Sequence, residues 1–138
     1  MGKTTVSVDV INTIDLGMSE IGKVAAHEIR HEQILFTVDT GATFVSLPID
    51  IIERLGLHEV GKTKLITANG TVERRTYSPV RIAIMGRQTD VNVIELPIGT
   101  PSLLGVIPLE ALDLIVNPRM QRLEGNPAHG GEYMIEAL

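Results

Sequence analysis

A short apolar run that ends in Asp39-Thr40-Gly41 constrains the fold of this chain more than any other feature. The run covers residues 34–38, Ile-Leu-Phe-Thr-Val. An almost continuous apolar run of this length, stopped by turn-forming residues, is typical of a buried central strand. We therefore predict a strand over 34–38 that delivers a polar loop carrying the Asp39 carboxylate.

Composition favours a fold built mainly from strands around one core. The chain has 138 residues, 43% of them hydrophobic, but only two Tyr, two Phe and no Trp. Aliphatic side chains must then form most of the core, and β-branched Val and Ile suit strands better than helices. We expect one all-β domain over residues 1–125. The tail over 126–138 is expected to be a linker or a dimer-interface strand.

Charge and cysteine content exclude several function classes. The net charge is −5 and no basic run exceeds two residues, so we expect no nucleic-acid partner. The absence of cysteine excludes disulfides, thiolate zinc sites and a cysteine nucleophile. No apolar stretch has the length of a signal peptide's core or a membrane span. We expect a soluble, cytoplasmic protein.

The pattern along the first half predicts strand, loop and helix. Alternating valines over 6–10 indicate a half-buried first strand, and a second is expected within 23–29. After the Asp39 loop, Pro48 fits the first turn of a helix. An apolar stripe over 49–55 continues it, and Gly56 fits its end.

The second half repeats this outline. Asn69-Gly70 predicts a tight turn in a projecting hairpin, because this dipeptide tolerates positive backbone angles. A second hairpin turns at 86–88, and its last strand leads to Leu103-Leu104-Gly105 and a helix opened by Pro108. Short strands are expected over 114–116 and 121–124. The repetition suggests two halves related by a pseudo-twofold axis.

The residue types around Asp39 suit a precisely held carboxylate. Gly41 lets backbone amides approach the carboxylate without a Cβ in the way. The hydroxyls of Thr40 and Thr43 can donate hydrogen bonds inside the loop. The tripeptide alone is a weak signal, but here an apolar strand, Ala-Thr, a helix, a glycine-tipped hairpin and an apolar-apolar-glycine element accompany it in a fixed order.

With these elements the chain resembles the retropepsin-like aspartic peptidases, the single-lobed relatives of pepsin. The specific motifs lie in 36–43, 67–70 and 103–105. The resemblance implies a closed β-barrel with one or two short helices and pseudo-twofold halves. It also implies a homodimer that hydrolyses peptide bonds in a polypeptide substrate without a cofactor or metal, because one Asp-Thr-Gly supplies half an active site.

The resemblance also assigns roles to residues. It implies that Asp39 is catalytic and shares a proton with Asp39 of a second copy. The other assigned residues are the active-site loop, Thr40, Gly41, Ala42 and Thr43; the flap, Thr67, Ala68, Asn69 and Gly70; and the psi-loop under the catalytic loop, Leu103, Leu104 and Gly105.

Two positions depart from the retroviral pattern. Retroviral members usually carry Asp at the position of Thr43 and Arg at the position of Val106. Those two side chains normally pair, and losing both leaves no unpaired buried charge. The chain is therefore expected to be closer to the cellular and bacterial branch, with a differently built dimer interface.

Two other functions remain open. A catalytically silent dimeric peptide-binding or assembly module would keep the same fold. The run His27-Glu28-Ile29-Arg30-His31 matches H-E-x-x-H, which on a helix would bind zinc through His27 and His31 with Glu28 as general base. Because the run is short and lies between two expected strands, a solvated strand and turn is the favoured interpretation.

Overall fold

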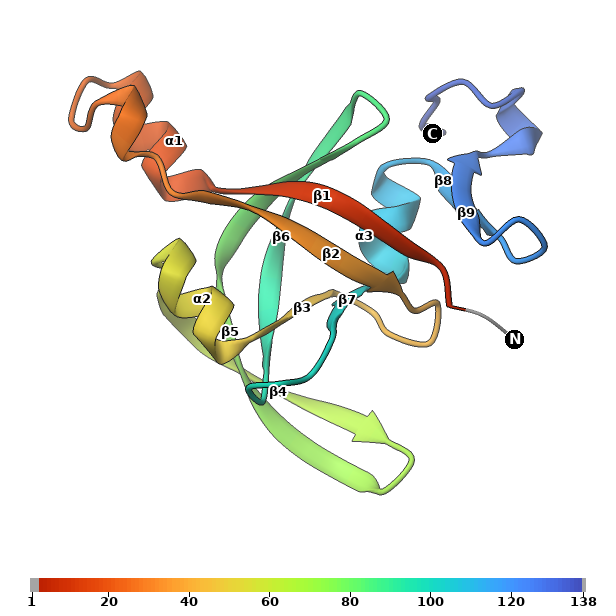
Figure 1. Ribbon diagram of the computed structural model, residues 1–138, viewed down its shortest axis with the longest axis horizontal. Coiled ribbons are helices and arrows are strands. Elements are labelled where there is room, and N and C mark those ends of the chain that lie inside the picture. Colours follow the sequence, from red (N-terminus) through yellow and green to blue (C-terminus); the bar gives the residue numbers. More distant parts are fainter. Residues whose placement is uncertain (1–2, 138) are drawn as a thin grey trace.

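The computed structural model describes residues 3–137, and strands dominate it (Figure 1). The strands are β1 (Thr5–Asn12), β2 (His31–Val38), β3 (Val45–Pro48), β4 (Glu59–Thr67), β5 (Gly70–Ile84), β6 (Arg87–Leu96), β7 (Ser102–Leu104), β8 (Leu114–Asn117) and β9 (Arg122–Gly125). The helices are α1 (Thr13–Glu20), α2 (Ile49–Leu55) and α3 (Val106–Ala111), with 3-10 helices η1 (Ala26–Glu28) and η2 (Pro127–His129).

Six of the strands close into a barrel. The seven-stranded sheet has the order β1-β2-β7-β3-β6-β5-β4. A further antiparallel pairing of β1 with β5 closes the barrel and leaves β4 outside it. β4 pairs only with β5 and extends away from the barrel as the projecting hairpin at the bottom of Figure 1. β8 and β9 form a separate two-stranded sheet. The expected closed all-β barrel with short helices is confirmed.

The pairings obey a pseudo-twofold rule. Exchanging β1 with β5, β2 with β6 and β3 with β7 maps the antiparallel pair β1–β2 onto β5–β6. The same exchange maps the parallel pair β2–β7 onto β6–β3 and leaves the pairs β1–β5 and β3–β7 unchanged. Each half ends in a helix, α2 or α3. The two-half organisation expected from the sequence is therefore present in the topology.

The core is aliphatic and fills the barrel. Val8 and Val10 of β1, Phe36 of β2 and Leu104 of β7 are completely buried. Phe36 lies three residues before Asp39, so burial of this ring fixes the strand that delivers the carboxylate. Leu104 lies directly before Gly105 and fixes β7 beside it.

The region between β1 and β2 differs from the expectation. The strand predicted within 23–29 is wrong, because these residues follow α1 as an irregular segment that contains η1. The Asn12 side chain accepts a hydrogen bond from the Asp15 backbone and caps α1. Asp15 in turn binds the Arg30 guanidinium, with Nε to Oδ2 at 2.9 Å. Contacts between residues distant in sequence thus set this segment.

Turns and strand limits differ in smaller ways. The first hairpin turns at Ala68-Asn69, one residue before the predicted position, and only Gly70 has a positive φ there, +111°. The second turns at Met85-Gly86, whose φ angles of 54° and 76° fit a type I′ turn. β5 runs unbroken through both hairpins. β3 was not predicted, and α3 begins before Pro108.

The chain after Gly125 folds back on the domain. Within residues 126–137 the structure has η2 and no strand. The Tyr133 hydroxyl donates to the Ala111 carbonyl at 3.0 Å, and the Met134 amide donates to the Asp113 carboxylate at 3.1 Å. The segment expected as a linker or interface strand is therefore fastened to the end of α3.

None of the helices within residues 3–137 combines the length and apolarity that crossing a bilayer requires.

Candidate active site

Asp39 follows the last residue of β2, at a point held from both sides. The Val38 amide donates to the Thr4 carbonyl at 2.8 Å, and the Asp39 amide donates to the Leu104 carbonyl at 3.0 Å. β2 runs parallel to β7 here, with Val38 paired to Leu104. The backbone at Asp39 is therefore fixed by two neighbouring strands that the sequence alone does not connect.

The turn after Asp39 orients its carboxylate. The Gly41 amide donates to Asp39 Oδ1 at 2.9 Å, and the Ala42 amide donates to the Asp39 carbonyl at 3.0 Å. A Cβ on Gly41 would lie 3.1 Å from Oδ1, tighter than most such contacts. Asp39 is half-buried, and its Oδ2 accepts no hydrogen bond from residues 3–137. One carboxylate oxygen is thus anchored and the other is free to act.

The two threonines of the loop do not contribute as expected. Neither the Thr40 nor the Thr43 hydroxyl donates a hydrogen bond to another of the described residues, and both side chains are exposed. The expectation that these hydroxyls fix the carboxylate within one chain is wrong. The Gly41 amide fulfils that role, because the tight turn brings it close enough to the carboxylate.

The start of α3 supports the loop from below. The Val106 amide donates to the Ala42 carbonyl and the Ile107 amide to the Thr43 carbonyl, both at 2.9 Å. These two amides belong to the first turn of α3, where the helix leaves them without internal partners. Backbone hydrogen bonds therefore hold the loop at Thr43 and Val106, the two positions at which retroviral members usually carry the ion pair.

Gly105 is required because of close approach. Its amide donates to the Phe44 carbonyl at 3.0 Å, and a Cβ there would lie 2.5 Å from the same oxygen. Its φ of −90° is open to any residue, so conformational freedom is not the reason. Packing of two backbones explains the glycine that follows Leu103 and Leu104.

A cleft of about 500 Å³ lies between the loop and the β4–β5 hairpin. Gly41, Ala42 and Thr43 line one side, and residues 63–67 of β4 line the other. Leu103 contributes from β7. The structure thus brings together most of the predicted loop residues, Leu103 and Thr67 around one space.

The remaining predicted residues lie around this cleft or beneath it. Asp39 and Thr40 adjoin its wall at Gly41 without lining it, and Leu104 and Gly105 are buried below the loop. Ala68, Asn69 and Gly70 form the exposed tip of the hairpin. Sequence reasoning did not identify Arg74, Ile94 and Leu96, which also line the cleft. The signal available in the sequence was the alternation of side chains between the two faces of β5 and β6, the strands that carry these three residues.

The H-E-x-x-H run does not lie on a helix. His27 belongs to η1 and His31 begins β2, and both side chains are exposed. His31 Nδ1 lies 3.6 Å from Asp9 Oδ1 on β1, while Arg30 turns to Asp15. Nowhere within residues 3–137 do three His, Asp or Glu side chains cluster so that they could hold a metal ion. The helical face that zinc chemistry requires is absent from this segment.

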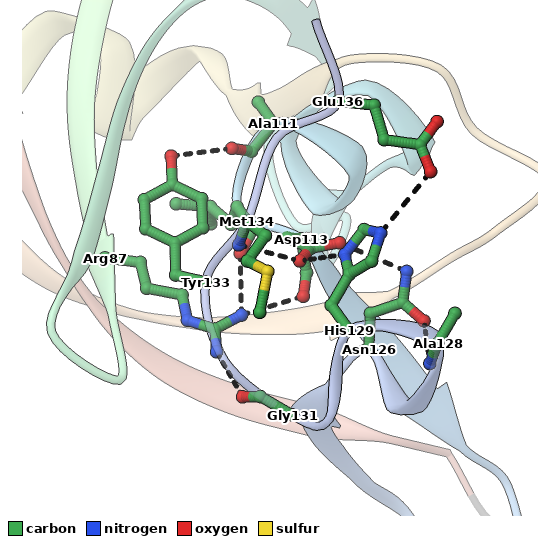
Figure 2. Close-up of polar contacts among 11 residues, drawn as sticks. Arg87, Ala111, Asp113, Asn126, Ala128, His129, Gly131, Tyr133, Met134 and Glu136 are labelled. Carbon is green, nitrogen blue, oxygen red and sulfur yellow. Dashed lines mark hydrogen bonds and ion pairs between the residues drawn. The ribbon is translucent and has the colours of Figure 1, made fainter.

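A second polar cluster, at the end of α3, was not predicted. The Asp113 carboxylate lies 2.7 Å from His129 Nδ1 and accepts a hydrogen bond from Asn126 Nδ2 at 3.1 Å (Figure 2). The Arg87 guanidinium donates to the carbonyls of Asp113 and Gly131, both at 2.7 Å, and lies over the Tyr133 ring. We call this the tail clamp. Asn126 directly before Pro127 is a capping signal for η2. Its hydrogen bond to Asp113 joins positions too far apart in the sequence to be inferred.

The carboxylate and imidazole of the clamp shift each other's titration. Their hydrogen bond is the main cause that lowers the pKa of Asp113 and raises the pKa of His129. Glu136, with Oε1 3.5 Å from His129 Nε2, acts in the same direction on the imidazole. The clamp holds the tail against α3, whose first turn supports the Asp39 loop.

Comparisons with known proteins agree with this geometry. The family model described as "gag-polyprotein putative aspartyl protease" matches residues 25–111, more than half of the chain. Among solved structures, the EIAV protease complexed with the inhibitor HBY-793 matches with a TM-score of 0.56 at 20% identity, covering 80% of this chain and 88% of that one. The comparison with curated proteins found no match.

The family match extends from η1 to α3 and so includes the Asp39 loop and the psi-loop. This chain therefore belongs to the gag-polyprotein aspartyl protease family and is a retropepsin-like aspartic peptidase in fold and family.

Proposed function

We propose that this protein is an aspartic endopeptidase whose active form is a homodimer, with one Asp39 from each chain in a shared site. The observation that carries the proposal is the Asp39 carboxylate itself, beside the cleft: the Gly41 amide anchors Oδ1, and no group within residues 3–137 donates to Oδ2. None of the other aspartates in the described chain lies on a comparable glycine loop. One chain therefore offers one such carboxylate, and the chemistry needs two.

The proposed mechanism divides two roles between two identical groups. The two Asp39 carboxylates of the proposed dimer would lie too close together for both to ionise. The pair therefore holds one proton and titrates as a unit. The ionised member takes a proton from a water molecule held between them, and the protonated member donates to the scissile carbonyl oxygen. Water attack then gives a tetrahedral intermediate, and proton transfer to the leaving nitrogen breaks the peptide bond.

The β4–β5 hairpin fits the role of a flap over a bound peptide. Its inner residues and the Asp39 loop line the same cleft, which supports closure of the hairpin over a substrate between them. Its tip is exposed and turns at Ala68-Asn69 with Gly70 at a φ of +111°. Closure would exclude bulk water from the reacting groups and orient the peptide.

The test compares Asp39→Asn with the unchanged protein on a mixture of peptides. The amide is nearly isosteric but cannot accept the proton, so we expect the same melting temperature and cleavage reduced by about a thousandfold or more. A statine-type inhibitor should abolish cleavage, and a chelator should leave it unchanged.

Other outcomes identify the alternatives. Cleavage that survives in Asp39→Asn and disappears with the chelator would support the zinc interpretation through His27 and His31. Peptide binding without cleavage by the unchanged protein would support the silent binding module.

A further inference from the structure

The two faces of the β4–β5 hairpin differ in exposure. Thr63 pairs with Arg74 and Leu65 with Val72, and all four side chains are half-buried. The alternate pairs, such as Lys64 with Glu73, are exposed. Residues directly opposite in an antiparallel pair share a face of the sheet. Arg74 is therefore on the inner face, and it lines the cleft beside the Asp39 loop.

Arg74 has no acidic partner in the described chain. The adjacent Arg75 binds Glu95: its Nε lies 3.0 Å from Glu95 Oε2, and the Tyr77 hydroxyl donates to the same oxygen. Arg74 itself forms no ion pair and no side-chain hydrogen bond with residues 3–137. A half-buried guanidinium without a partner is available to a ligand.

The cleft around Arg74 has a charge opposite to that of the whole molecule. The chain carries a net charge of −5, yet Arg74 lines the cleft from the inner face of the hairpin and no carboxylate is among the residues that line it. The rest of the wall is largely apolar and includes Phe44, Ile94 and Leu96. Apolar walls keep water away and strengthen a charge pair formed between them.

We propose that Arg74 is a specificity-determining residue, and that this cleft is a subsite for an aspartate or glutamate side chain of the peptide substrate. This inference rests on the proposed endopeptidase function and adds the substrate class. A guanidinium matches a carboxylate with two parallel N–H donors, which an amide side chain cannot use in the same way. Phe44, Ile94 and Leu96 would contact the methylene groups of the bound residue.

The experiment uses a positional-scanning peptide library in which each position carries Glu or Gln in otherwise identical sequences. We expect the unchanged protein to cleave peptides with Glu at one position about ten- to a hundredfold faster than the Gln peptides, the range of a charge-assisted contact. Arg74→Glu should remove this preference and favour Lys at the same position. Melting temperatures of both proteins verify folding.

The matched control is Lys23→Glu, which changes the net charge equally. Lys23 is exposed in the segment after α1 and is not among the residues that line the cleft, so its variant should keep the preference for Glu. If Lys23→Glu loses the preference as Arg74→Glu does, overall charge rather than the subsite explains it, and the inference is overturned. Equal cleavage of Glu and Gln peptides at every position overturns it as well.

Binding separates this inference from the proposed function. The same library is titrated against Asp39→Asn, with and without Arg74→Glu, so that no cleavage is needed. Tighter binding of Glu peptides that depends on Arg74 supports the subsite even if the unchanged protein cleaves nothing, in which case only the proposed endopeptidase function fails. Binding that does not distinguish Glu from Gln, or no binding at all, overturns the subsite.

Discussion

At the scale of single residues, two glycines determine the geometry around Asp39 for different reasons. Gly41 presents its amide to the carboxylate, and Gly105 lets β7 lie against the backbone of residues 42–44. The sequence made Gly41 predictable because it belongs to a recognisable tripeptide. The reason for Gly105 lies in a contact across more than sixty positions of chain, from Phe44 to Gly105, which local patterns do not reveal.

We predict that Gly105→Ala destabilises the protein and displaces the Asp39 loop. The added Cβ would meet the Phe44 carbonyl oxygen at 2.5 Å, so the backbone must move, at a cost of about 1–3 kcal/mol. Thermal unfolding should show a melting temperature several degrees lower. Cleavage by the folded fraction should fall with it.

Gly17→Ala is the matched control for this change. Gly17 lies within α1 and a Cβ there meets no atom within 4 Å. Alanine is the better helix former by about 1 kcal/mol, so this variant should be slightly more stable. Unchanged stability of Gly105→Ala would show that the close contact under the loop is not formed.

At the scale of elements, local patterns predicted some segments and failed for others. The strand over 34–38, the helix over 49–55 and the hairpin around Gly70 follow from periodicity and turn chemistry within a few residues. α1 was missed because its sequence, TIDLGMSE, contains glycine and β-branched residues, and its stability depends on Asn12 and on Asp15 bound to Arg30. β3 is four residues long and defined by its neighbours β6 and β7.

The tail clamp predicts an attachment of residues 126–134 that depends on pH. The pKa of His129 is raised in the folded chain. Its charge therefore stabilises the attached tail fully below about pH 6.5, and this stabilisation is lost as pH rises through the raised pKa. The pKa of Asp113 is lowered. Its carboxylate therefore stabilises the attached tail above about pH 4, and this stabilisation is lost as pH falls through the lowered pKa. The tail should therefore be held most firmly between about pH 4 and 6.5.

Hydrogen exchange of the tail amides across pH measures this, after correction for the intrinsic exchange rate. Protection should be greatest inside the window and decline on both sides. His129→Asn should abolish the decline on the alkaline side, whereas His31→Asn, at an exposed position on β2, should leave it unchanged. Protection that does not vary with pH would rule out the ion pair as the tail's fastening.

At the scale of the whole molecule, the closed barrel presents one Asp-Thr-Gly loop. The pseudo-twofold pairing builds two similar halves, yet only the first carries aspartate after its second strand, and the corresponding loop after β6 reads Pro97-Ile98-Gly99. In the proposed mechanism, the second carboxylate therefore comes from another chain. Sequence reasoning reached this through the single Asp-Thr-Gly, but the shape of the cleft and the position of Arg74 required the folded chain.

Mixing active and inactive chains tests this central claim most directly. Unchanged protein and Asp39→Asn are combined in varying proportion, allowed to exchange subunits, and assayed on one peptide at constant total concentration. If each site needs Asp39 from two chains, mixed dimers are inactive and activity falls with the square of the unchanged fraction. Activity that remains strictly proportional to the number of unchanged chains would show that one chain is sufficient and would contradict the account.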